Sequence, residues 1–197
     1  MMPDELKKAE DRLKHQSYEA IDHELSTCSS GDLLALLDSK SRKVADTAAT
    51  WLDRRKETKL LVNALVSDRI HTALGRVRAT NILNWFGLAA PEAVKAYLYL
   101  LSDRSADVVD NALFGIVFAR RRDLLPTLRE HLERLPAGSP RREDFTEAIK
   151  ALEANDPSLF SRGFLDAGNV WRLNEPAPPY TAEEKLEVDG KGENTDG

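Results

Sequence analysis

The sequence predicts an all-α protein, a short right-handed α-solenoid of helix pairs followed by a disordered acidic C-terminal tail. Up to about Leu173 the apolar residues recur at helical spacing, and no stretch alternates between apolar and polar residues as a strand does. Short polar breaks separate the apolar segments, which indicates helices of about 8 to 16 residues that pack as antiparallel neighbours. We therefore expect no β-sheet.

The first predicted element is a charged amphipathic helix over residues 4–25, which ends at a polar break over 26–31. Asp32 is placed to cap the leucine-rich helix at 33–37. Further breaks are rich in Asp, Ser, Gly or Pro, and they fall at 38–42, 67–72, 87–91, 102–107, 121–123 and 136–140. The predicted helical domain covers residues 1–173.

Apolar and small residues recur after three aspartates, Asp38, Asp68 and Asp103, each of which follows an apolar helix. The residues 6, 11 and 14 positions beyond them are Val44, Leu74 and Val109; Ala49, Ala79 and Phe114; and Leu52, Ile82 and Val117. Each unit is predicted to be a helix, a turn that contains the aspartate, and a second helix, and a weaker fourth unit extends the array to about residue 152. The aspartates are interpreted as caps of the second helices, and the last group of residues is expected to be buried.

The first unit gives the array its resemblance to a known family. An apolar helix and a turn aspartate are followed by Val44, Ala48, Ala49 and Leu52, in the pattern Val-x-x-x-Ala-Ala-x-x-Leu. This pattern resembles a HEAT-type helical repeat, and the resemblance covers about residues 33–152. The signature of tetratricopeptide repeats, Trp-x-x-Leu-Gly-x-x-Tyr, is absent. The resemblance implies stacked helix pairs whose second helices line a concave side.

The sequence changes twice beyond the repeats. Asp156-Pro157 breaks the helical pattern, and a sparse apolar cluster follows, made of Phe160, Phe164, Leu165, Val170 and Trp171. We interpret residues 156–173 as a cap over the open end of the array, because a terminal repeat otherwise exposes an apolar edge. Residues 174–197 are rich in Pro, Gly and acidic residues and are predicted to be disordered.

Charge and composition exclude several classes of protein. The tail accounts for the whole net charge of −5, so the body is neutral, which argues against a dedicated nucleic-acid binder. No apolar run reaches the about 18 to 20 residues of a membrane span, and residues 1–10 are charged where a signal peptide is apolar. We therefore expect a soluble, cytoplasmic protein that makes no membrane contact.

The residue patterns typical of enzymes are absent. Neither glycine-rich phosphate-binding motif occurs. His15, Glu19 and His23 share one face of a helix, but a solvated polar face is the simpler interpretation. Cys28 is the single cysteine, has no recognisable local signature and can form no internal disulfide. We therefore predict no catalytic residue, no metal site and no cofactor.

The predicted binding surface is the side of the second helices that faces away from the core. Positions 8, 12 and 16 beyond the three aspartates share one helical face. They are Asp46, Thr50 and Arg54; Arg76, Thr80 and Asn84; and Asn111, Gly115 and Ala119, with Asp110 beside them. Such a surface is polar and of mixed charge, and it suits another protein or a peptide better than a small molecule. Arg54, Arg76 and Asn84 are expected to be exposed.

The basic runs 54–56 and 120–122 stand at the predicted ends of second helices. Cations there complement the negative carboxyl end of the helix dipole, which is their simpler interpretation. The same runs are the best candidates in the sequence for docking an acidic partner. Trp51, Trp85 and Phe114 fall inside the second helices and are expected to pack between helices.

These observations predict a non-enzymatic protein-binding module. A small HEAT-like chain with no catalytic motif resembles immunity or inhibitor proteins that neutralise a toxin, or adaptor subunits. The alternative is an enzyme, because HEAT-like folds also occur in DNA alkylation-repair glycosylases. The candidates for such a site are Arg76, Arg78, Trp85, Asp110 and residues 120–122. The neutral charge of the body counts against this alternative.

Overall fold

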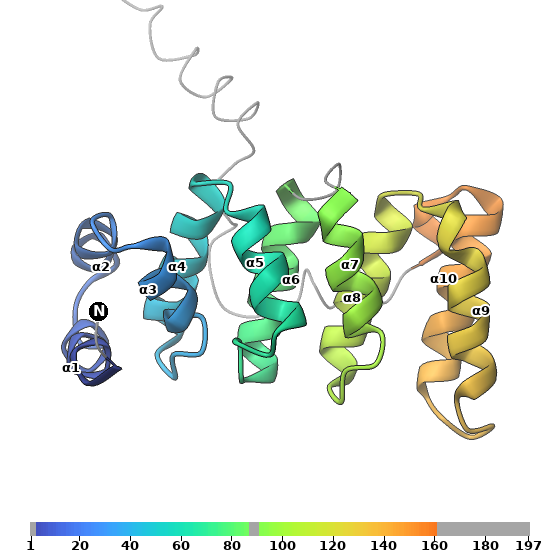
Figure 1. Ribbon diagram of the computed structural model, residues 1–197, viewed down its shortest axis with the longest axis horizontal. Coiled ribbons are helices and arrows are strands. Elements are labelled where there is room, and N and C mark those ends of the chain that lie inside the picture. Colours follow the sequence, from blue (N-terminus) through green and yellow to red (C-terminus); the bar gives the residue numbers. More distant parts are fainter. Residues whose placement is uncertain (1–2, 87–90, 161–197) are drawn as a thin grey trace, which may run out of the picture.

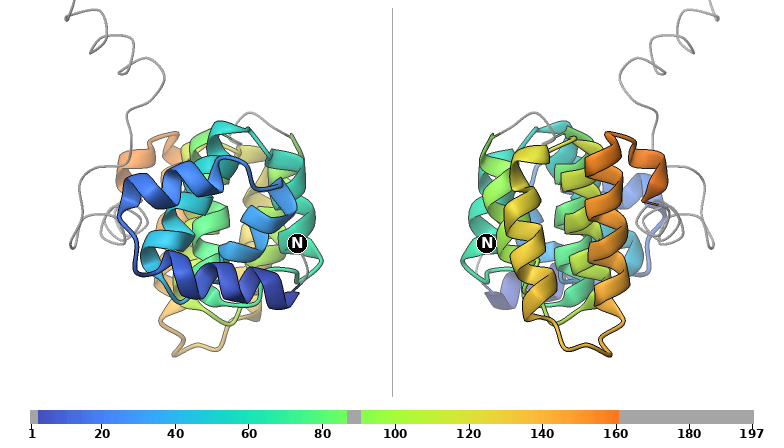
Figure 2. Two further views of the ribbon diagram at one scale, coloured as in Figure 1. Left: turned by 90° about the vertical axis from the view of Figure 1, so that its left-hand side faces the viewer. Right: turned by 90° about the vertical axis from the view of Figure 1, so that its right-hand side faces the viewer.

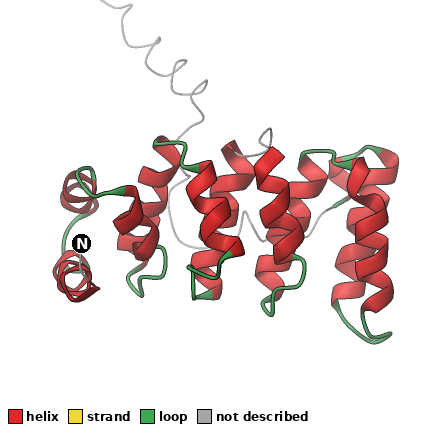
Figure 3. Cartoon of the chain, viewed as in Figure 1, coloured by secondary structure: helices red, strands yellow, loops and turns green. Residues whose placement is uncertain are grey.

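The computed structural model describes residues 3–86 and 91–160, and every regular element in these ranges is helical (Figure 3). The α-helices are α1 (Pro3–Leu13), α2 (Tyr18–Leu25), α3 (Ser30–Leu36), α4 (Arg42–Arg54), α5 (Thr58–Val66), α6 (Ala73–Phe86), α7 (Pro91–Leu100), α8 (Ala106–Phe118), α9 (Leu125–Arg134) and α10 (Arg141–Ala154). Two short 3-10 helices, η1 (Arg122–Leu124) and η2 (Pro157–Leu159), precede α9 and follow α10. The all-α prediction is confirmed for these residues.

Four helix pairs stand side by side in a row: α3 with α4, α5 with α6, α7 with α8, and α9 with α10 (Figure 1). The second helices α4, α6, α8 and α10 contact one another in that order, and α5 contacts α7. Seen along the row, the first and second helices of the pairs form two layers (Figure 2). Helices α1 and α2 lie at the N-terminal end of the row, where α2 packs on α4.

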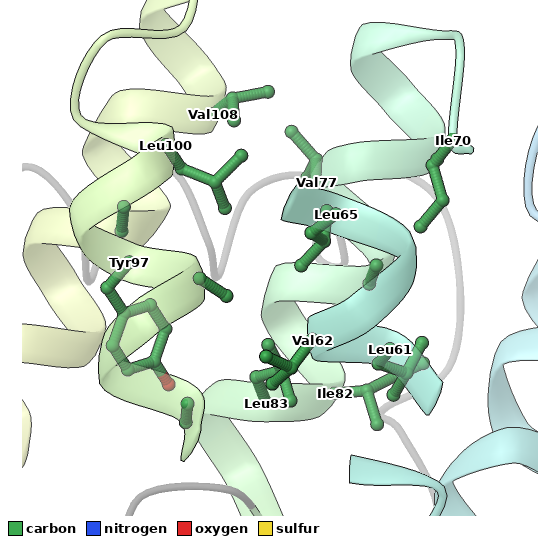
Figure 4. Close-up of a cluster of buried hydrophobic side chains, with 14 of the residues drawn as sticks. Leu61, Val62, Leu65, Ile70, Val77, Ile82, Leu83, Tyr97, Leu100 and Val108 are labelled. Atoms are coloured by element: carbon green, nitrogen blue, oxygen red, sulfur yellow. The ribbon is translucent and has the colours of Figure 1, made fainter. Parts of the chain in front are cut away.

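The core lies between the two layers of helices. Its members on the second and third pairs include Leu61, Leu65, Leu83, Tyr97 and Leu100 (Figure 4). Alanines stand in the middle of three second helices, and all three are fully buried: Ala48, Ala79 and Ala112. A small side chain at these points lets neighbouring helices approach closely, which keeps the core continuous along the row.

The burial predicted for positions along the second helices, counted from the turn aspartates, is correct in part. Leu52, Ile82 and Val117 are buried, as predicted, but Leu74 is 47% exposed. The cause lies in the turns, because α4 begins four residues after Asp38, α6 five after Asp68 and α8 three after Asp103. Positions counted from the aspartates therefore point in different directions on the three helices. When residues are counted from the start of α4, α6 and α8, the seventh residue of each helix is a buried alanine. The eleventh residue is also buried in all three helices, as Leu52, Leu83 and Ile116.

Two predicted helix boundaries are wrong. Residues 4–25 form two helices, because the side chain of Ser17 caps a new helix by accepting a hydrogen bond from the Ala20 N–H at 3.4 Å. The leucine-rich helix begins at Ser30, and Ser29 caps it through the N–H of Asp32 at 3.1 Å. Asp32 is therefore inside the helix, where its carboxylate accepts the Ser29 hydroxyl in return.

The predicted C-terminal cap is described only as far as Phe160. Residues 156–160 comprise η2 and Phe160, whose side chain is buried against the core. Residues 161–173 and the predicted disordered tail over 174–197 lie outside the described residues.

Candidate protein-binding face

The outer side of the second-helix layer is the candidate functional site, and we call it the second-helix face. Helical spacing places its members opposite the buried alanines of α4, α6 and α8. They are Asp46, Thr50 and Arg54 on α4, Leu74 and Asn81 on α6, Asp110, Phe114 and Phe118 on α8, and Lys150 on α10. Four of the ten predicted surface residues, Asp46, Thr50, Arg54 and Asp110, thus belong to this face.

Helix α4 carries the predicted row Asp46, Thr50 and Arg54 on the second-helix face. Asp46 is held by two guanidinium groups, Arg42 Nε at 3.3 Å and Arg78 Nε at 2.9 Å. The Thr50 hydroxyl donates to the carbonyl of Asp46 at 3.0 Å. Arg54 is exposed, as predicted, and its guanidinium lies over the Trp51 ring, 4.8 Å from the centroid. Arg54, whose Nη1 also pairs with Asp22 Oδ1 at 3.3 Å, is therefore the exposed charged group of this row.

The predicted row on α6 points toward α8 instead of outward. Arg76 forms a two-pronged ion pair with Asp103, with Nε–Oδ2 at 2.6 Å and Nη2–Oδ1 at 3.0 Å. Thr80 and Asn84 are buried, and Asn84 Nδ2 donates to the carbonyl of Asn111 at 3.0 Å. The expected exposure of Asn84 is wrong and Arg76 is half-buried, because α6 starts later after its aspartate than α4 does.

Asn111, on α8, faces α6 and is also buried. Gly115 lies at the point of closest approach: a Cβ there would stand 2.5 Å from Asn84 Oδ1 and 2.6 Å from Cζ of Tyr97. No side chain larger than hydrogen fits between the helices at this position. Asp110, one residue before Asn111, is half-buried on the second-helix face. Asn111 and Gly115 are thus buried, whereas Asp110 and Ala119, the C-cap residue of α8, are half-buried.

Arg78 connects α4 to α6, a role that the sequence reading missed. Its side chain is buried, with Nε on Asp46 and Nη1 donating to the Leu37 carbonyl at 3.0 Å. A buried charge requires both an opposite charge and satisfied hydrogen bonds, and Arg78 has both. The signal in the sequence was an arginine in the middle of an otherwise uncharged helical segment, 77–84.

The turn aspartates connect neighbouring helix pairs. Asp38 accepts hydrogen bonds from the backbone N–H groups of His71 and Thr72, at 2.8 and 2.9 Å, and so binds the turn before α6 rather than capping α4. Thr72 caps α6, because its hydroxyl accepts the Gly75 N–H at 2.9 Å. Asp103 caps its own turn through the Ser105 N–H at 2.8 Å. Burial opposes ionisation of Asp103, but Arg76 and this N–H hold its pKa below the ordinary value. Asp68 accepts the Tyr99 hydroxyl at 2.8 Å.

The other chemical candidates take part in structural contacts. Burial, followed by the charges of Asp32 and Glu24, raises the pKa of the Cys28 thiol, so the thiol is protonated near neutral pH. Arg55 donates to the carbonyls of Cys28 and Ser26, at 2.7 and 2.8 Å, from beyond the end of α4. Within the described ranges no cluster of three or more His, Cys, Asp or Glu side chains could hold a metal ion.

Asp53, in the last turn of α4, has a strongly perturbed carboxyl group. Burial raises its pKa to about 6, against an opposing effect of the Arg54 charge, and its Oδ1 atom has no hydrogen-bond partner in the part of the chain described. A carboxylate at the C-terminal end of a helix also meets the negative end of the dipole. Because the folded pKa lies above the unfolded value, Asp53 weakens the fold progressively as pH rises from about 4 to 6.

Asp53→Asn is expected to stabilise the protein at pH 7.5, because the amide occupies the same space without a charge. Two pKa units correspond to roughly 3 kcal/mol, and screening of this half-buried group reduces the expected gain to about 1 kcal/mol. Urea unfolding of both chains at pH 7.5 and pH 4 measures it. The gain should shrink as pH falls from 6 to 4, and an equal gain at both pH values would contradict the assigned pKa.

Comparison with family models, with curated proteins and with solved structures found no match for this chain. Among the described helices, none has the length and apolar character needed to span a membrane.

Proposed function

We propose that this protein is a non-enzymatic binding module, a short right-handed α-solenoid of HEAT-like helix pairs that holds another protein. The leading form of the proposal is an immunity or inhibitor protein that neutralises a toxin. The observation that carries it is the second-helix face itself, where Arg54 on α4 and Asp110 and an aromatic pair on α8 stand on the same side, with α6 between the two helices. Arginine and aromatic residues are the types enriched at protein interfaces.

Rigidity supports the proposal. The helices under the face are tied together by Asp46–Arg78, Arg76–Asp103 and Asn84–Asn111 contacts, all of which join different helices or turns. A surface that is already ordered loses little conformational freedom when a partner binds, so more of the contact energy appears as affinity.

The aromatic pair provides an anchor of the kind that interfaces use. The rings of Phe114 and Phe118 stack with centroids 5.2 Å apart, and Phe118 is 47% exposed. Together with Arg54 over Trp51, this gives the face two aromatic-based contact points on α8 and α4. A folded partner that covers both would bury apolar surface and one cation at once.

The geometry of the cations counts against the glycosylase alternative. Arg76, Arg78 and Arg121 are engaged by Asp103, Asp46 and Asp123 in ion pairs of 2.6 to 2.9 Å. A basic channel for DNA needs positive charge in excess of the carboxylates around it, because phosphate contacts dominate the affinity. Arg120 and Arg122 are exposed but lie beyond the end of α8.

Arg54→Glu is expected to weaken partner binding by about tenfold or more, because a central arginine at an interface contributes about 2 kcal/mol. The partner is sought first among the products of genes adjacent to the one that encodes this chain, and affinity is measured by titration calorimetry. Lys59→Glu, an exposed charge reversal on the first helix α5, is the matched control and should leave the affinity unchanged. Equal binding by the parent and the Arg54 variant would remove the second-helix face from the proposal.

A further inference from the structure

Buried polar groups from three helices meet where α6, α7 and α8 approach one another. They belong to Asn84, Tyr97 and Asn111, which are between 1% and 4% exposed. One oxygen of each, namely Asn84 Oδ1, Tyr97 Oη and Asn111 Oδ1, has no hydrogen-bond partner within residues 3–86 and 91–160. Buried polar groups in native proteins are nearly always hydrogen-bonded, either to the protein or to an ordered water molecule.

Hydrogen bonds to the backbone fix the orientation of both asparagine side chains. Asn84 Nδ2 donates to the Asn111 carbonyl at 3.0 Å, and Asn111 Nδ2 donates to the Asp107 carbonyl at 2.8 Å. Exchanging the nitrogen and the oxygen of either amide would set two acceptors against each other. Asn84 Oδ1 and Asn111 Oδ1 are therefore the atoms that need a donor.

Gly115 allows these groups to come together. A Cβ on Gly115 would stand 2.5 Å from Asn84 Oδ1 and 2.6 Å from Tyr97 Cζ, so these two atoms are no more than about 5 Å apart. The Tyr97 hydroxyl points toward Leu83, near the end of α6 (Figure 4). Asn111 precedes Gly115 by one helical turn and lies on the same side of α8. A water molecule that bridges two oxygens spans up to about 5.6 Å, because each hydrogen bond is about 2.8 Å long.

We propose that one ordered water molecule binds among Asn84, Tyr97 and Asn111. It accepts a hydrogen bond from the Tyr97 hydroxyl and donates one to Asn84 Oδ1 and one to Asn111 Oδ1. Water matches this set of one hydroxyl donor and two acceptors, because a buried water typically makes about three hydrogen bonds. The site joins α6, α7 and α8, and it belongs to the free protein whether or not the proposed toxin is the partner.

The character of the three side chains supports a neutral ligand. All of them are uncharged, so nothing in the set would neutralise a bound ion. Burial raises the pKa of the Tyr97 hydroxyl, which therefore keeps its proton at neutral pH and remains a donor.

The first test is Tyr97→Phe, which removes the hydroxyl and keeps the ring. Loss of the hydrogen bond to water should raise the equilibrium constant for unfolding, measured in urea, by about fivefold. Tyr99→Phe is the matched control on the same helix. Its hydroxyl binds Asp68 at 2.8 Å on the surface, so the constant should change less than twofold. An unchanged or smaller constant for Tyr97→Phe would overturn the proposal, because removal of a buried hydroxyl without a partner is neutral or stabilising.

Oxygen-17 relaxation dispersion then counts the water molecules that stay bound for longer than the protein takes to tumble. The parent should hold one more of them than Tyr97→Phe, in which the water keeps only two of its three partners and leaves sooner. Tyr99→Phe should keep the parental count. An equal count in the parent and Tyr97→Phe would refute the water site even if that variant is less stable, because the hydroxyl would then bind Asn84 Oδ1 directly.

Discussion

The Leu52→Asp variant is expected to show no cooperative unfolding transition, because its fold is already lost near room temperature. Leu52 is fully buried in α4, and the variant loses the burial of a leucine side chain and places an unpaired carboxylate in the core. The combined cost is about 4 kcal/mol or more, a large share of the roughly 5 to 15 kcal/mol that stabilises a typical domain. Circular dichroism at 222 nm during thermal unfolding measures the loss.

Leu74→Asp is the matched control for this prediction. Leu74 aligns with Val44 when residues are counted from the turn aspartates, but it is exposed in the first turn of α6. A carboxylate near the N-terminal end of a helix is favourable, so this variant should melt within a few degrees of the parent. If the two leucine variants were destabilised equally, the positions assigned to the second helices would be wrong.

The second large effect is expected from Arg78→Ala, with a cost of about 3 kcal/mol. The substitution leaves Asp46 with one partner, Arg42, and removes the donor to the Leu37 carbonyl inside the protein. Unfolding in urea gives the free energy, and Arg69→Ala, at an exposed arginine in the turn before α6, should cost far less.

A double-mutant cycle distinguishes the ion pair from simple loss of packing. Asp46→Ala combined with Arg78→Met should be less destabilising than the sum of the two single changes, because neither partner is then left as an unpaired buried charge. Strict additivity of the two changes would mean that the Asp46–Arg78 contact contributes nothing specific to stability.

The sequence predicted those features of the fold that depend on neighbouring residues. Apolar spacing identified the helices, and polar breaks such as 38–42 and 67–72 coincide with the observed turns. The burial of Leu52 was also predictable, because the Ala-Ala pair before it leaves one side of α4 for packing. The split of residues 4–25 at Ser17 was missed, since a single capping serine is a weak signal within a charged segment.

The candidate site was predictable on α4 and wrongly placed on α6. A difference of one or two residues in turn length rotates every position of the next helix by about 100° or 200°. Counting from the aspartates therefore placed Arg76 and Asn84 on the outer side. In the structure both side chains face α8 instead. The Asp46–Arg78 pair joins residues 32 apart in the chain, and no local pattern specifies such a partner.

The bonds between neighbouring helix pairs also determine the order in which the protein can assemble. Asp38 binds the turn before α6, Arg76 binds Asp103, and Arg141 binds the carbonyls of Asp103 and Arg104, each over a separation of 27 to 38 residues. Each bond can close as soon as the next pair has left the ribosome, with no need to wait for the C-terminus. Synthesis from the N-terminal end thus allows vectorial folding, in which every completed pair is the template on which the next one docks.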